Sequence, residues 1–166
     1  MPTINSKACV VDGKPVDKVY SNGRKIYGRN LLTGTSGEWH TWTGTLGGGL
    51  SHPTAKNAEA GIRLTVGKKY TYSVNLVSPI DSHVIVRLIS DDNNSAKEYF
   101  GNIVTVGDTG ISTVTFDVAS GYTKAIFYSL RAVNSNTETH TWQFKDEKLE
   151  QGTIHTAWSP APEDVM

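Results

Sequence analysis

The stretch YTYSVNLV at residues 70–77 alternates apolar and polar side chains with a period of two. Successive side chains of a β-strand point to opposite faces, so this pattern predicts a strand with one buried face. The same alternation recurs in VIVRL (84–88), TVTFDV (113–118), IFYSLR (126–131) and TWQFK (141–145). Turn-rich segments at 90–94 and 106–110 separate these stretches. Strands at this spacing predict an all-β sandwich or barrel.

Helical signals are weak. Residues 54–60 can form at most a turn or two. Residues 145–151 are rich in helix-forming types, but Leu149 is their only apolar anchor, so a helix there would have no face to pack. We therefore interpret 145–151 as the end of a strand, and the fold class as all-β.

The first 28 residues differ from the rest. Asp12-Gly13 and Asn22-Gly23 each lie between short apolar stretches. Such dipeptides supply the positive φ angles of a tight hairpin turn. We expect two small hairpins that form an arm or linker over residues 1–28, followed by a β-sandwich module over 29–166.

Charge and cysteine content exclude several classes of protein. Sixteen basic residues balance sixteen acidic ones, which argues against nucleic acid and against membrane adhesion by charge. Cys9 is the only cysteine, which excludes an intrachain disulfide and a thiolate metal cluster. Residues 1–5 lack the apolar run of a signal peptide, and no stretch is long enough to span a membrane. A protein that works outside cells yet lacks a signal peptide needs another exit route, and assembly into a virion released by lysis is one such route.

Two motifs near the ends of the module carry a resemblance to a known family. NLLTGTSGEW opens it at residues 30–39, and KLEQG (148–152) with AWSPAPED (157–164) closes it. Together with the hairpin at 19–27, they resemble carbohydrate-binding modules of phage tail and baseplate proteins. The similarity is greatest to modules carried by enlarged distal tail proteins of phages of lactic-acid bacteria. Residues 43–136 carry no matching motif.

This resemblance implies a jelly-roll β-sandwich of two antiparallel sheets and a role in carbohydrate binding. The implied partners are host cell-wall or capsular polysaccharide and other phage tail proteins, with the module located on the virion and acting at the host cell surface. No cofactor is expected, although jelly-roll sugar-binding modules often carry a structural calcium ion whose ligands the resemblance does not name.

Sugar binding uses flat aromatic rings that stack on a pyranose and planar polar groups that meet its hydroxyls. Polar candidates lie on the sides of the strands opposite the apolar rows: Asn75, Arg87, Arg131 and Gln143. If their four strands share one sheet, these side chains line one surface. The alternative is a solvated sheet face that binds no ligand.

The aromatic residues divide into candidate sugar platforms and residues that are expected to pack inside the protein. Trp42, His52 and Tyr99 lie in polar or turn-rich segments and are the candidate sugar platforms. Trp142 and Tyr128 lie on apolar rows, which predicts that they are buried in the core, while Trp39 and Trp158 lie within the recurring motifs and are expected to pack.

Catalytic and metal-binding patterns are weak. The histidines at 40, 52, 83, 140 and 155 have no metal-ligand spacing. Residues 91–94 (DDNN) offer oxygens but lack the glycine and distal glutamate of an EF-hand. There is no GxSxG elbow, and sequence alone does not pair the carboxylates of Asp81, Asp91, Asp92, Glu98 and Asp117 for glycoside hydrolysis. We therefore expect no enzymatic activity.

Three hypotheses remain open: a sugar-binding module, a structural or interaction module of the tail, and a glycan hydrolase. A sugar binder should expose at least one large aromatic ring near arginine or asparagine, which a spacer does not need. A hydrolase needs two carboxylates across a cleft.

Overall fold

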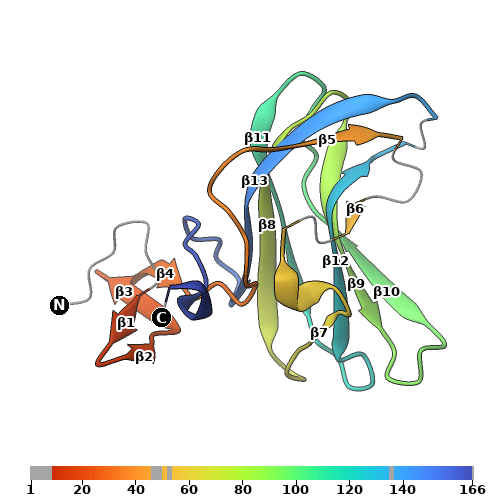
Figure 1. Ribbon diagram of the computed structural model, residues 1–166. Helices are drawn as coiled ribbons and strands as arrows, with labels where there is room; N and C mark the ends of the chain where they lie inside the picture. Colours follow the sequence, from red (N-terminus) through yellow and green to blue (C-terminus); the bar gives the residue numbers. More distant parts are fainter. Residues whose placement is uncertain (1–8, 46–49, 52–53, 135–136, 166) are drawn as a thin grey trace.

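Two antiparallel sheets pack face to face in the computed structural model, which describes residues 9–45, 50–51, 54–134 and 137–165 (Figure 1). The five-stranded sheet has the order β10 (Ala96–Phe100), β9 (Ser82–Ile89), β12 (Lys124–Ala132) and β6 (Leu50–Ser51), with β7 (Ile62–Arg63) also paired to β12. The four-stranded sheet has the order β11 (Thr109–Asp117), β8 (Lys69–Val77), β13 (His140–Gln151) and β5 (His40–Gly44). The chain passes back and forth between the sheets, as in a jelly roll. The predicted all-β sandwich is confirmed.

The weak helical signals are resolved in the expected way. Residues 145–151 form the end of β13, which confirms that this stretch is strand. The segment 54–60 contains one short 3₁₀ helix, η1 (Lys56–Ala58), and a second, η2 (Pro162–Asp164), lies in the closing motif. Among the described residues, no helix has the length and hydropathy needed to cross a membrane.

The core lies between the two sheets. Tyr72 of β8 and Phe127 of β12 meet there with ring centroids 4.9 Å apart, and both are fully buried. Trp142 is also fully buried, as predicted, and its indole Nε1 donates a hydrogen bond of 3.1 Å to the Ser82 hydroxyl. This bond crosses from one sheet to the other and satisfies the polar atom of the largest core side chain.

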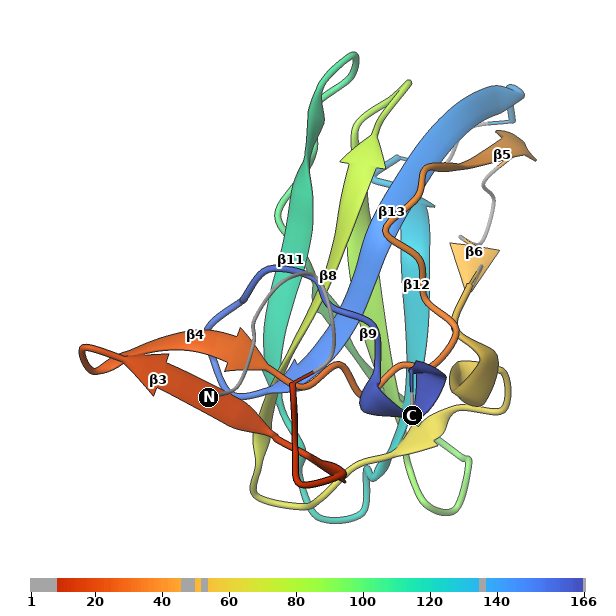
Figure 2. The same cartoon turned by 60° about the vertical axis from the view of Figure 1, so that its left-hand side comes forward.

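Both predicted hairpins are present. The first pairs β1 (Val10–Val11) with β2 (Lys14–Pro15), and the second pairs β3 (Lys18–Ser21) with β4 (Arg24–Gly28). At their tips Asp12 and Asn22 both have a φ of 49°, and the glycines that follow have φ values of 73° and 74°. Two consecutive positive φ angles are the conformation of a type I′ turn, which Asn-Gly and Asp-Gly favour. The hairpins lie beside one end of the sandwich (Figure 2).

A buried ion pair joins the second hairpin to the sandwich. Lys25 Nζ of β4 lies 2.5 Å from Glu150 Oε2 of β13, and both side chains are almost completely buried. The Gly28 amide donates a hydrogen bond of 3.1 Å to the Thr156 hydroxyl nearby. The arm therefore rests on the last turns of the chain and not only on its own turns.

The Asn30 side chain connects the opening motif to the closing motif. Its Nδ2 donates hydrogen bonds to the Thr35 hydroxyl and to the carbonyls of Glu147 and Ser159, at 3.0 to 3.3 Å. Its Oδ1 accepts bonds from the amides of Leu32 and Leu149, both at 3.1 Å. Asn30 is fully buried, so these bonds replace all of its contact with water.

A bulge in β13 changes which of its residues face the core. Lys145 pairs with Asn75, and Lys148 pairs with Ser73, so β13 has one residue more than β8 between these pairs. Asp146, within the bulge, has a φ of 58°. Trp142 and Phe144 face the core before the bulge, whereas Leu149 does so after it. The neighbouring Lys148 and Glu150 consequently face the arm.

We expect a chain shortened to residues 29–166 to unfold cooperatively, but at a lower temperature than the full chain. Every member of the core cluster lies between Leu31 and Leu149, so the core is complete without the arm. The loss of Lys25 leaves Glu150 without its closest cation. Thermal unfolding followed by circular dichroism measures both effects. A gradual, non-cooperative melt would show that the arm belongs to the folding unit.

Replacing Asn30 by alanine should lower the free energy of unfolding by roughly 3 kcal/mol or more, because five hydrogen bonds are lost and buried amides are left unpaired. Urea unfolding measures this. The control is Asn134→Ala, an exposed position where about 0.5 kcal/mol or less is expected. Equal effects of the two substitutions would contradict the role of Asn30.

Candidate functional site

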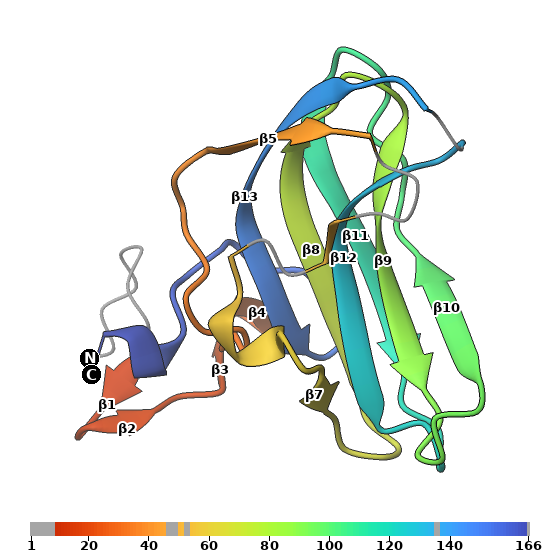
Figure 3. The same ribbon diagram turned by 45° about the vertical axis from the view of Figure 1, so that its right-hand side comes forward.

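The outward surface of the five-stranded sheet gathers aromatic and charged side chains. We call this surface the β9 face. Residues directly opposite each other in antiparallel strands point to the same side of the sheet, so the strand register defines its members. They are Ala96, Glu98 and Phe100 of β10, His83, Ile85, Arg87 and Ile89 of β9, Lys124, Ile126, Tyr128 and Arg131 of β12, and Arg63 of β7. The β9 face runs along the side of the sandwich away from the arm (Figure 3).

One row across the β9 face carries two aromatic rings. Phe100 and Tyr128 both pair with Ile85, from opposite sides. The two aromatic residues therefore lie two strand spacings apart, roughly 10 Å. Phe100 is 55% exposed and its ring lies 5.5 Å from that of His83, while Tyr128 is half-buried. This row offers two aromatic surfaces to a ligand.

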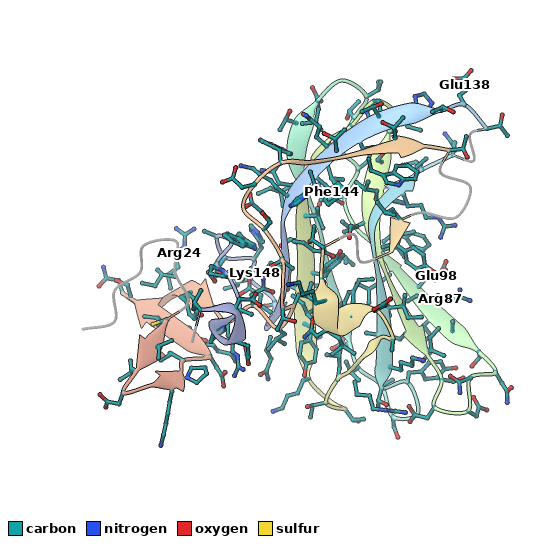
Figure 4. All side chains as sticks on the ribbon, in the orientation of Figure 1. Arg24, Arg87, Glu98, Glu138, Phe144 and Lys148 are labelled. Atoms are coloured by element: carbon teal, nitrogen blue, oxygen red, sulfur yellow. The ribbon has the colours of Figure 1, made fainter. Side chains whose placement is uncertain are left out.

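Next to this row, one carboxylate lies between two guanidinium groups. Glu98 Oε1 is 3.9 Å from Arg87 Nε and 3.9 Å from Arg131 Nη1. Glu98 and Arg87 are directly opposite each other on β10 and β9, and Figure 4 shows them together at this side of the molecule. Ile85 lies between these groups and is fully buried although it points outward. Larger side chains therefore cover it.

A solvent-open hollow of about 590 Å³ continues the β9 face toward the turn between β9 and β10. It is lined by Arg87, Ile89, Asn93, Asn94, Ser95, Ala96 and Glu98. The turn is held by its own hydrogen bonds: the Asp92 carboxylate accepts from the Asn94 amide at 3.1 Å and from Asn94 Nδ2 at 3.0 Å. The turn that forms one wall of the hollow is thus fixed by hydrogen bonds, and the opposite wall carries the charged side chains of Arg87 and Glu98.

The four polar candidates from the sequence divide into two pairs. Arg87 and Arg131 lie together on the β9 face. Asn75 and Gln143 lie on β8 and β13, in the other sheet, so the premise that all four strands share one sheet is wrong. An alternating pattern shows which side chains share a side of their own strand, but it does not show which strands pair.

Two of the aromatic candidates face the interior. Trp42 pairs directly with Trp142, and their rings pack 5.4 Å apart. Tyr99 pairs with Val86 and packs on Phe116 at 5.8 Å. Both are half-buried, which corrects the expectation that they form exposed platforms. The third candidate, His52, lies outside the described residues.

Tyr128 was expected in the core and is on the β9 face instead. A bulge in β12 explains the difference: Tyr128 pairs with Ile85 and Arg131 with His83, so β12 has one residue more than β9 in this interval. Leu130 and Phe127 both face the core as a result. Sequence reasoning also missed Phe100, which occupies the outward side of a short edge strand.

The outward surface of the other sheet holds a smaller hollow of about 190 Å³. Ser73, Asn75, Ile111, Asp146, His155, Ala157 and Trp158 line it. Trp158 donates a hydrogen bond from Nε1 to the Thr35 hydroxyl at 3.2 Å, which confirms that it packs against the opening motif. Trp39 differs from its expected packing role: it is 41% exposed, with Lys145 Nζ 4.8 Å from its ring.

The described residues contain no group of three or more His, Cys, Asp or Glu side chains that could hold a metal ion. In the turn at 91–94, Asp91 Oδ1 accepts bonds from the amide and hydroxyl of Thr123, at 3.2 and 2.6 Å. Asp92 is likewise bonded within its own turn. Protein donors therefore bond to Oδ1 of Asp91 and to both carboxylate oxygens of Asp92.

No protein-family model matches the sequence, and no curated protein matches it either. The solved structures that are similar to this chain include the following two. One contains the CBM22-1 and GH10 modules of an endo-1,4-β-D-xylanase of Clostridium thermocellum complexed with xylohexaose, with a TM-score of 0.44, 11% identity, and 77% of this chain and 28% of that chain covered. The other is a CBM4 structure, with a TM-score of 0.38, 18% identity, and 82% and 76% of the two chains covered. At such low TM-scores, neither similarity says what this chain binds.

A second group of charges lies at the junction between the arm and the sandwich. Lys148 Nζ donates to the Thr156 hydroxyl at 2.8 Å and to the Ala157 carbonyl at 2.7 Å, and lies 3.8 Å from Glu150 Oε1. Burial lowers the pKa of Lys148 to about 8, Glu150 opposes this shift, and Lys25 adds to it. Because these groups are buried and bonded to one another, we interpret the junction as structural.

This pKa predicts how stability depends on pH. The folded pKa of Lys148 lies below the value of 10.5 expected for an unperturbed lysine, so between these values the unfolded chain binds more protons. The free energy of unfolding of the parent should therefore rise relative to that of Lys148→Met, by roughly 2 kcal/mol between pH 8 and 10. Urea unfolding of both proteins across this range measures the difference. If the free energies of unfolding of the two proteins changed in parallel with pH, Lys148 would not be desolvated in the folded chain.

Proposed function

We propose that this chain is a non-catalytic carbohydrate-binding module of a phage tail protein that holds the virion on host cell-wall polysaccharide. The observation that carries the proposal is the exposed ring of Phe100 next to the Arg87, Glu98 and Arg131 side chains on the β9 face. The module acts at the host cell surface, and its partners are the polysaccharide and the other proteins of the tail.

The chemistry of the β9 face suits a sugar. A pyranose ring presents C–H groups on its flat sides, which pack on an aromatic ring, and hydroxyls at its edge. Phe100 and Tyr128 supply rings for the flat sides, whereas the arginines and Glu98 supply donors and acceptors for the hydroxyls. A surface open to solvent along two strands also accommodates a chain of sugars rather than a single unit.

The alternatives are less well supported. A purely structural module needs no exposed ring beside guanidinium groups, yet Phe100 is 55% exposed. A glycan hydrolase needs two carboxylates roughly 5–10 Å apart across a cleft. Glu98 is the one carboxylate among the described residues that line the larger hollow.

The role in a phage tail rests on the resemblance of the opening and closing motifs. These motifs meet at the arm end of the molecule, where the Arg29 guanidinium pairs with the Glu163 carboxylate and the Gly34 amide bonds to Asp164. The β9 face lies away from this end (Figure 3). A tail protein attached at the arm end would leave the β9 face free for the host surface.

Binding by one module should be weak, in the range of about 0.01–1 mM, or −7 to −4 kcal/mol. Each polar contact replaces one that the sugar already made with water and gains only about 0.5–1.5 kcal/mol. Several copies on one tail would strengthen attachment through effective concentration.

Replacing Arg87, Arg131 or Phe100 by alanine should weaken the binding of a fluorescently labelled module to intact Gram-positive cells, each by roughly tenfold. The melting temperature should change little, because all three side chains point away from the core. Gln143→Ala, on the opposite sheet, is the matched control and should bind like the parent. If the arginine variants bind like Gln143→Ala, the β9 face is not the binding surface.

A further inference from the structure

The β9 face has a local excess of positive charge, although the chain as a whole has sixteen basic and sixteen acidic residues. Its basic members are Arg63, Arg87, Lys124 and Arg131. Glu98 lies among them, and the adjacent turn adds Asp91, 3.5 Å from Arg63, and Asp92, which is bonded within the turn. Four basic groups therefore face three acidic ones.

The outward surface of the four-stranded sheet is balanced by comparison. Lys69 pairs with Asp117 across β8 and β11, with Nζ and Oδ1 2.7 Å apart. Lys145 and the neighbouring Asp146 lie 3.9 Å apart. Each of these cations has an anion beside it, so the positive excess belongs to the β9 face and is not general.

The two central arginines have spare hydrogen-bonding capacity. Both distances to Glu98 Oε1 are 3.9 Å, which is ion-pair range but longer than the roughly 2.7–2.9 Å of a charge-assisted hydrogen bond. Neither guanidinium donates a hydrogen bond to any described residue, and Arg87 Nε is buried without a partner. A guanidinium has five N–H donors in a planar fork that matches a carboxylate or a phosphate.

We propose that the ligand of the β9 face is an anionic polysaccharide, whose acidic groups bind to Arg87 and Arg131 while its sugar rings lie on Phe100 and Tyr128. This inference rests on the proposed function and names its substrate class. Glu98 lies between the two guanidinium groups and offsets one of their charges, so the trio keeps one net positive charge for the ligand.

The effect of Glu98→Gln distinguishes an anionic ligand from a neutral one. With an anionic ligand, loss of the carboxylate removes a repulsion, so affinity should rise by about threefold or more. With a neutral glycan, loss of the carboxylate removes a strong acceptor for hydroxyls, so affinity should fall. The matched control is Asp117→Asn, which removes one negative charge from the opposite sheet and should leave affinity unchanged.

The experiment uses the full chain and wall polysaccharide released from a Gram-positive strain that the labelled module binds. Affinity is measured by titration calorimetry for the native polysaccharide and for two treated samples, one with its carboxyl groups reduced and one with its phosphate groups removed. We expect at least a tenfold loss of affinity in one treated sample, which identifies carboxylate or phosphate as the acidic group. Binding of the native polysaccharide should also weaken as salt rises from about 0.1 M to 1 M, where the Debye length falls from about 10 Å to 3 Å.

The outcomes separate the two proposals. If both treated samples bind like the native one and Glu98→Gln lowers affinity, the ligand is neutral, and the anionic proposal is overturned while the sugar-binding function stands. If the parent binds no strain of a broad Gram-positive panel, the proposed function itself fails. Higher affinity for Glu98→Gln but not for Asp117→Asn, together with loss on one treatment, supports the anionic ligand.

Discussion

The side chain of Asn30 joins the first and last segments of the sandwich. A carboxamide has two donor hydrogens and an acceptor oxygen, and Asn30 uses them to reach the opening motif, β13 and the closing motif at once. A hydrophobic residue at this position would leave the amides of Leu32 and Leu149 buried and unpaired. The two motifs are more than a hundred residues apart in sequence, and Asn30 joins them at one end of the molecule together with the Trp158–Thr35 and Gly34–Asp164 hydrogen bonds.

Two bulges decide what each sheet presents to its surroundings. The bulge in β13 turns Lys148 and Glu150 toward the arm, where Lys25 completes a buried cluster of charges. The bulge in β12 lets Leu130 stay in the core while Arg131 points outward beside Glu98. Each inserts one residue and shifts the alternation of the strand that follows. The charged part of the β9 face therefore depends on an irregularity of β12 and not on a regular strand.

Much of the fold could be predicted from local patterns. The alternation in 70–77 and its repeats gave the strands, and the Asp-Gly and Asn-Gly dipeptides gave both hairpins, because these signals depend on neighbours in sequence. The candidate site was predicted only in part. Asn75 and Gln143 were grouped with the arginines because pairing between distant strands leaves no trace in periodicity. The prediction for Tyr128 was wrong because a bulge in β12 changes the alternation. The predictions for Tyr99 and Trp42 were wrong because a side chain with polar neighbours in sequence can still face the core.

Buried and exposed polar groups constrain the sequence to different degrees. Asn30 and the Lys25–Glu150 pair are buried polar groups at the arm end. Those of the β9 face are partly exposed and make only long ion pairs with one another. Replacing one of these side chains thus changes the surface without breaking a short hydrogen bond or burying an unpaired charge, which are common causes of large losses of stability. Residues 43–136, which supply every member of the β9 face, carry no motif that matches the family resembled at the two ends of the module. The lack of a matching motif there has a physical explanation. Many sequences can form an exposed sheet face, whereas few can make the buried contacts around Asn30.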